Sequence, residues 1–129
     1  MIEWSGTAFG VFATEGTEIR YAEVPPSLTL GATAVFGVGN RQFSVTRNSE
    51  SNRYGVIYRT ASDNLEFVHV DDSGTVGPPV PVTSVDASPD LAPAVHFIGS
   101  DSTFDGLPTP YVALYTATST AGDVHFHLI

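Results

Sequence analysis

Three short runs of this sequence share one pattern: Phe9-Gly10-Val11-Phe12-Ala13, Tyr54-Gly55-Val56-Ile57-Tyr58 and Tyr111-Val112-Ala113-Leu114-Tyr115. Each run begins with an aromatic residue and is followed, after a turn, by a second alternating run. The second runs align on an apolar residue, any residue and an aromatic residue, which are Ile19-Arg20-Tyr21, Leu65-Glu66-Phe67 and Val124-His125-Phe126. Alternating runs joined by a short turn are typical of β-hairpins. The chain therefore contains one predicted hairpin three times.

The rest of the 129-residue chain also favours strands. Nine prolines and twelve glycines interrupt it every few residues, and no segment has the apolar spacing of a helix. Further alternating runs are Ile2–Trp4, Gln42–Thr46, Val80–Thr83 and Ala94–Ile98. The predicted fold class is all-β.

These runs follow one another in a recurring order: an inner strand, two hairpin strands and an outer strand. The segments Val80-Pro81-Val82-Thr83, Pro93-Ala94-Val95-His96-Phe97 and Tyr111–Tyr115 carry this order most clearly. In this the chain resembles the four-stranded blade repeats of bacterial β-propellers. The resemblance implies three antiparallel blades in one repeat domain, at about 1–36, 41–83 and 92–129, of which the last lacks its outer strand. Three repeats of four strands also fit a β-trefoil, which is the alternative.

Pro81 and the number of blades lead to two structural expectations. A proline removes a backbone donor, so the strand that contains Pro81 is expected at a sheet edge. Propellers close with about four to eight blades. Three open blades would leave two apolar faces in water, so we expect copies of the chain to form a homo-oligomer, most simply a dimer. The alternative is an excised or designed fragment of a longer propeller.

Charge and composition restrict the partners. The formal net charge is -9, with 14 acidic residues against 5 basic ones. This disfavours nucleic acid and anionic membranes, which carry the same sign. The chain has no cysteine, so neither a disulfide nor a cysteine-ligated metal is possible. Its start, Met1-Ile2-Glu3-Trp4, has no basic segment typical of a signal peptide. The localisation stays open between the cytoplasm and a piece of a longer secreted protein.

Five residues are candidates for binding a ligand. Arg20, Glu66 and His125 occupy the same position in the three hairpins, although their chemistry differs. His125 and His127 lie two residues apart on one strand and face the same side, where both could reach a metal. No such pair recurs in the other hairpins, so we expect no metal site and no cofactor. Trp4 is the fifth candidate, because exposed aromatic rings stack on sugar faces.

The other chemistry-bearing residues favour structural roles. His69 and His96 stand singly on strands and are predicted to be half-buried packing residues. The acidic segments 71–74 and 101–106 are predicted to form turns that bind their own backbone. No nucleophile or phosphate-binding motif occurs, so no catalytic residue and no enzymatic activity is predicted. The sequence favours a structural or assembly module. A lectin-like or protein-binding recognition domain is the alternative, and a fragment of a glycoside-hydrolase-type propeller is less favoured.

Overall fold

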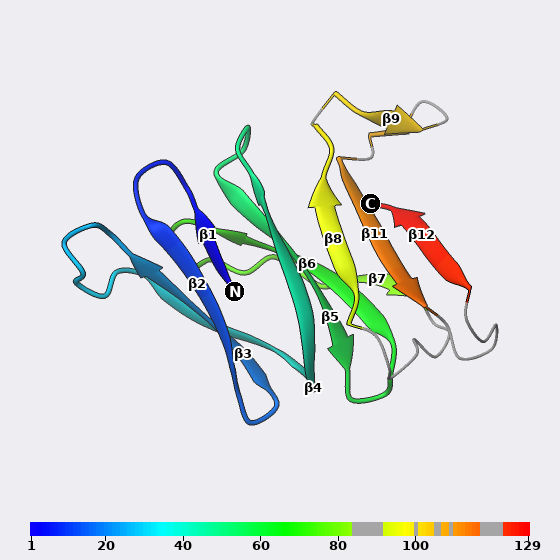
Figure 1. Ribbon diagram of the computed structural model, residues 1–129, viewed down its shortest axis with the longest axis horizontal. Coiled ribbons are helices and arrows are strands. Elements are labelled where there is room, and N and C mark those ends of the chain that lie inside the picture. The colour runs from blue at the N-terminus through cyan, green and yellow to red at the C-terminus, as the bar shows by residue number, and fades with distance from the viewer. Residues whose placement is uncertain (84–91, 100, 105–106, 109, 117–122) are drawn as a thin grey trace.

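A computed structural model describes residues 1–83, 92–99, 101–104, 107–108, 110–116 and 123–129 (Figure 1). These residues form β-strands joined by turns and loops, and they include no helix. The all-β prediction is confirmed. None of these segments is a helix that could cross a membrane.

Seven strands form one antiparallel sheet in sequence order. They are β1 (Ile2–Trp4), β2 (Phe9–Glu15), β3 (Glu18–Val24), β4 (Thr33–Asn48), β5 (Arg53–Thr60), β6 (Leu65–Asp71) and β7 (Val80–Thr83). The strand β7, which contains Pro81, lies at the edge of this sheet, as predicted. Gly16, in the β2–β3 turn, has φ of 62°, a left-handed conformation that glycine adopts without a steric cost.

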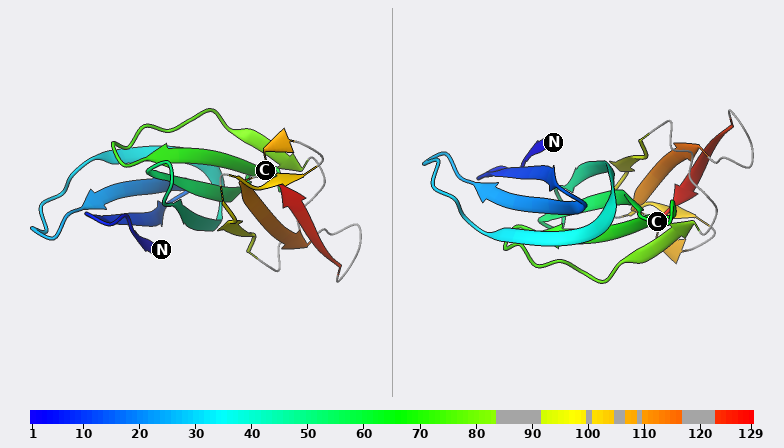
Figure 2. Two further views of the ribbon diagram at one scale, coloured as in Figure 1. Left: turned by 90° about the horizontal axis from the view of Figure 1, so that it is seen from above. Right: turned by 90° about the horizontal axis from the view of Figure 1, so that it is seen from below.

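The strand β4 belongs to two units at once. Residues 33–38 pair with β3, and residues 43–48 pair with β5. The register shifts between Gly39 and Phe43, and β4 curves from one unit into the next (Figure 2). The seven-stranded sheet thus consists of two four-stranded units that share β4.

The third unit is a separate sheet, here called the third sheet, with the strand order β12-β11-β8. Its strands are β8 (Ala94–Phe97), β11 (Tyr111–Thr116) and β12 (Val124–Leu128). Two short strands, β9 (Thr103–Phe104) and β10 (Leu107–Pro108), pair with each other beside it. The third sheet packs against the second unit through β8, which contacts β4 and β5.

Two hydrophobic clusters join the three units. The first unites residues of the first hairpin with one face of the second, through Phe12, Ile19, Tyr21, Phe36, Val45, Tyr54, Val56, Tyr58, Val68 and Val70. The second cluster unites the opposite face of the second hairpin with the third sheet, through Ile57, Leu65, Phe67, Val82, Val95, Tyr111 and Ala113. The β5–β6 hairpin is consequently covered on both faces.

Candidate functional site

The three hairpins have the same register, so their residues can be compared position by position. The aromatic residue that opens each first hairpin strand pairs with the preceding inner strand, as Trp4 with Phe9, Arg47 with Tyr54 and Phe97 with Tyr111. Three residues further on, each hairpin pairs Phe12 with Tyr21, Ile57 with Phe67, or Leu114 with Phe126. Residues at the same position of this pairing pattern are therefore structurally equivalent in the three units.

A joint, meaning the contact between successive units, is built in the same way twice. At the first joint, the rings of Phe12 and Tyr21 lie 5.2 and 5.6 Å from the ring of Tyr54. At the second joint, the ring of Phe67 lies 4.9 Å from that of Tyr111. In both cases the second hairpin strand covers the opening aromatic residue of the next unit.

The inner strands are also linked across each joint. The backbone N–H of Val95 donates to Ser44 Oγ at 3.2 Å, and that of Phe97 donates to Thr46 Oγ1 at 3.2 Å. At the equivalent place in the first joint, Val45 N–H points to Met1 Sδ at 3.2 Å. Side-chain acceptors on one inner strand thus satisfy the free backbone donors of the next.

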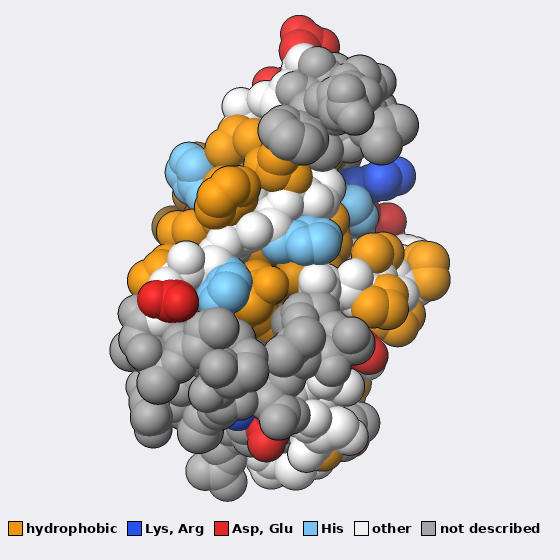
Figure 3. Space-filling view, turned by 90° about the vertical axis from the view of Figure 1, so that its right-hand side faces the viewer, with side chains coloured by type: hydrophobic (Ala, Val, Ile, Leu, Met, Phe, Trp, Pro, Cys, Tyr) orange, Lys and Arg blue, Asp and Glu red, His pale blue; other side chains and the backbone are white. Residues whose placement is uncertain are grey.

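The outer face of the third sheet lacks the cover that its equivalents have. Leu114, Val124 and Phe126 are 45%, 69% and 71% exposed. Their equivalents in the first two hairpins are at most 2% exposed. Figure 3 shows hydrophobic side chains and histidines gathered on this side of the molecule. A hollow of about 190 Å³ lies here, lined by Ala92, Ala94, Leu114, Tyr115, Thr116 and Val124.

The first unit is uncovered on its opposite face. Ile2 and Phe9 are 64% and 41% exposed, whereas their buried equivalents, Val45 with Val95 and Tyr54 with Tyr111, are at most 7% exposed. Trp4 adds an exposed indole that lies 4.6 Å from the Phe9 ring. We call these two surfaces the leading face (Ile2, Trp4, Phe9) and the trailing face (Ile98, Leu114, Val124, Phe126).

The five residues predicted from sequence do not converge on one site. Arg20 and Glu66 contact their own hairpins instead. Arg20 forms ion pairs with Glu15 at 2.7 Å and Glu18 at 3.2 Å. Glu66 accepts a hydrogen bond from the Tyr58 hydroxyl.

The two histidines lie on β12 and Trp4 on the leading face. His125 stacks on Tyr115 with ring centroids 5.6 Å apart, and His127 is exposed opposite Ala113. Among the residues that the structure describes, no three metal-ligating side chains come together. The polar candidates therefore give no common site, whereas Trp4 belongs to a larger apolar surface.

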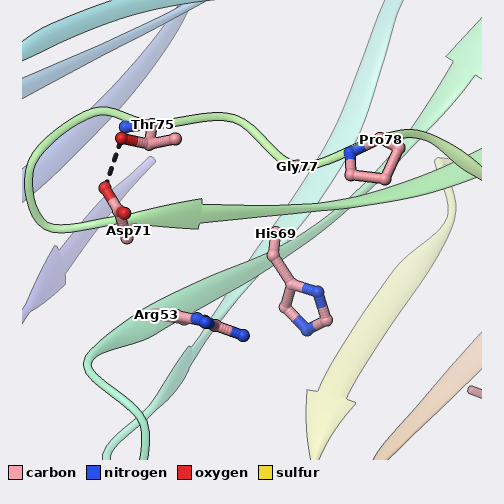
Figure 4. A pocket seen from close by; sticks show the side chains of 6 residues that line it. All are labelled: Arg53, His69, Asp71, Thr75, Gly77 and Pro78. Atoms are coloured by element: carbon pink, nitrogen blue, oxygen red, sulfur yellow. Dashed lines mark hydrogen bonds between the residues drawn. The ribbon is translucent and has the colours of Figure 1, made fainter.

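A polar pocket that the sequence did not predict lies beside the second hairpin. It has a volume of about 260 Å³ and is lined by Arg53, His69, Asp71, Thr75, Gly77 and Pro78 (Figure 4). Arg53 and Asp71 are cross-strand partners, but no ion pair joins them in the described part of the chain. Little in the sequence indicated this pocket, because Thr75, Gly77 and Pro78 lie in the connection between β6 and β7, far from Arg53 in sequence.

The acidic turn at this pocket behaves as predicted. Asp71 Oδ1 accepts hydrogen bonds from Ser73 Oγ at 2.6 Å and from Thr75 N–H at 2.8 Å. The hydrogen bond from the Ser73 hydroxyl lowers the pKa of Asp71 most, and the backbone N–H groups of Thr75 and Ser73 lower it further. Its neighbour Asp72 forms a bidentate ion pair with Arg47, at 2.6 and 3.1 Å. Both carboxylates therefore stabilise the connection between β6 and β7, and the segment 101–106 extends beyond the described residues.

His69 is half-buried, as predicted, but the prediction for His96 was wrong, because His96 is exposed. The His69 ring lies 4.9 Å from Phe67 and 5.3 Å from Tyr111. Burial among these rings, with the nearby Arg53 charge, lowers the pKa of His69. At neutral pH the imidazole is uncharged, which suits a position within the second joint.

The lowered pKa makes stability depend on pH. The unfolded chain takes up this proton below a pKa of about 6.5, before the folded chain does. The free energy of unfolding should therefore fall as the pH drops below that value, and His69→Gln should remove this part of the fall. Chemical denaturation of both proteins between pH 8 and pH 5 measures it. Equal pH dependence in the two proteins would contradict the assignment.

The chain matches no protein-family model, and neither curated proteins nor solved structures give a match. The two faces and the pocket are the features of the described residues that bear on function.

Proposed function

We propose that the chain is a non-catalytic, propeller-like assembly module that self-associates through its leading and trailing faces. One observation carries the proposal: residues whose equivalents are buried at two internal joints are exposed at the two outer faces. Burying apolar area of this kind contributes about 25 cal/mol per Å². A third joint of the same type, formed between copies, would remove both faces from water.

The arrangement of the units supports a propeller-like ring over a β-trefoil. The inner strands β1, β4 and β8 lie beside one another in order, and the units stack face to face. The leading face joins to the trailing face, so the contact is of the head-to-tail kind, which closes when the rotation per unit permits it. Two copies supply six units, a number within the range of about four to eight at which propellers close.

The solution mass tests this proposal. Light scattering during size-exclusion chromatography, over a hundredfold range of concentration, should give twice the chain mass of 13.7 kDa. A mass of one chain at every concentration would contradict self-association. A mass that rises without limit with concentration would indicate open head-to-tail fibres instead of a closed pair.

The pocket at Arg53 and His69 supports a second candidate function, recognition of a carbohydrate or a protein. It offers a guanidinium, an uncharged imidazole and the Thr75 hydroxyl beside aromatic rings. A glycan array probed with the wild type and with Arg53→Ala tests it: recognition at this pocket requires a signal that the variant loses. Hydrolysis is not supported, because the pocket includes one carboxylate, Asp71, whereas glycosidases use two.

A further inference from the structure

Each internal joint contains a tyrosine hydroxyl with a polar partner from the preceding unit. At the second joint, the buried Asn48 side chain donates from Nδ2 to the Tyr111 hydroxyl at 3.0 Å. At the first joint, the Tyr54 hydroxyl lies close enough to the side chains of Tyr21 and Ser5, both in the preceding unit, for them to affect its pKa. Both hydroxyls are buried, and a buried hydroxyl needs such a partner.

Ser5 and Asn48 occupy the same place in the repeat. Each follows directly after the residue that pairs with the opening aromatic residue of its own unit. Ser5 lies opposite Ala8, and Asn48 lies opposite Arg53. The third unit has Ile98 at this place, where its N–H donates to the Pro110 carbonyl at 2.9 Å.

At the two outer faces, both members of this pair are apolar. The leading face has Phe9 where the internal joints have Tyr54 and Tyr111. The trailing face has Ile98 where the internal joints have Ser5 and Asn48. The hydroxyl and its polar partner are therefore absent together, although the two residues lie on opposite sides of the molecule. A shared change of this kind is expected of residues that meet.

From this, and resting on the proposed self-association, we infer that the partner is a second copy of this chain whose Phe9 packs against Ile98. The apolar pair determines which faces join. A trailing face that met a tyrosine would bury its hydroxyl against Ile98 without a hydrogen bond. The trailing face of the second unit, if it met Phe9, would leave Asn48 Nδ2 without the hydroxyl that Tyr111 supplies. Each mismatch is costly, so the units join in one order only.

One further difference shows that the joint between copies is not a replica of the internal ones. A Cβ at Gly10 would come within 2.6 Å of the Tyr54 hydroxyl, and a Cβ at Gly55 within 2.7 Å of the Tyr111 ring. The third unit has Val112 at this position. Phe9 removes the hydroxyl but retains the ring, so the Phe9 ring must lie further out than Tyr54 does. We expect a wider joint between copies.

A double-mutant cycle tests the pairing. Phe9→Tyr adds a hydroxyl opposite Ile98, and Ile98→Asn adds an amide opposite Phe9. Each alone should weaken dimerisation about tenfold or more, since each buries a polar group without a partner. The double variant places an amide and a hydroxyl at the positions of Asn48 and Tyr111, so that each polar group has a partner, and it should recover a measurable part of the loss. Sedimentation equilibrium gives the four dissociation constants.

Leu30→Asn is the matched control, because Leu30 is exposed on the β3–β4 connection and lies outside both faces. It should leave the dissociation constant unchanged. We expect the variants to fold, because the substituted residues are exposed, and circular dichroism checks this. Losses that simply add in the double variant would overturn the pairing while leaving self-association intact. A wild type that is monomeric throughout would overturn both.

Discussion

Phe126→Glu should prevent the proposed self-association and leave folded monomers. Phe126 is 71% exposed in the single chain, so its replacement removes little from the core of the monomer. In the proposed joint it takes the place that Tyr21 and Phe67 have against Tyr54 and Tyr111. A carboxylate buried there without a partner costs at least about 3 kcal/mol, or roughly a hundredfold in the dissociation constant. Light scattering measures the mass, and circular dichroism measures the fold.

Leu30→Glu is the control for added charge and lost apolar surface. Leu30 is as exposed as Phe126 but lies in the connection between β3 and β4. It should leave the mass unchanged. Equal masses for wild type and Phe126→Glu, both above one chain, would place the contact elsewhere on the molecule.

Tyr111→Ala should cause the largest loss of stability at the second joint. Tyr111 is 1% exposed, and rings of Phe67, His69 and Phe97 surround it at 4.9 to 5.5 Å. Replacing a buried aromatic residue by alanine costs about 3–5 kcal/mol, a large part of a domain's stability. Chemical denaturation in a Phe126→Glu background measures this free energy of unfolding without the contribution of association.

Tyr111→Phe separates the ring from its hydroxyl. It keeps the packing but leaves the buried Asn48 amide without its 3.0 Å partner, so we expect a smaller loss of about 1–2 kcal/mol. A Tyr111→Ala variant as stable as Tyr111→Phe would show that the third sheet does not depend on this ring.

Much of the fold could be predicted from sequence because the repeated hairpins carry a simple apolar pattern. The expected runs at Ile2–Trp4 and Val80–Thr83 form strands with those same bounds, and the run Tyr111–Tyr115 lies within the strand Tyr111–Thr116. Pro81 correctly indicated an edge strand, since proline cannot donate to a further neighbour.

The long strand β4 was not predicted in full. Only its second half alternates clearly, whereas residues 31–39 contain three glycines and were given no strand. Pairing with β3 makes residues 33–38 a strand despite this composition. The β9–β10 hairpin was missed as well, because two-residue strands have too few residues to show a period.

The candidate site was harder to predict than the fold. Comparing polar residues across the hairpins selected Arg20, Glu66 and His125, which the fold leaves on separate units with partners of their own. Self-association was expected from the number of repeats alone. Which apolar residues form the two faces depends on exposure, which sequence does not give: Phe12 and Leu114 are equivalent in pattern, but only Leu114 is exposed.

Chemical cross-linking tests most directly whether a leading face meets a trailing face. Because the chain has no cysteine, Phe9→Cys and Phe126→Cys can be introduced together and treated with a short bifunctional thiol reagent. The proposed closed pair predicts a covalent species of two chains, which also forms when the two single variants are mixed. Chains that remain uncrosslinked, or a ladder extending beyond two chains, would contradict the closed pair.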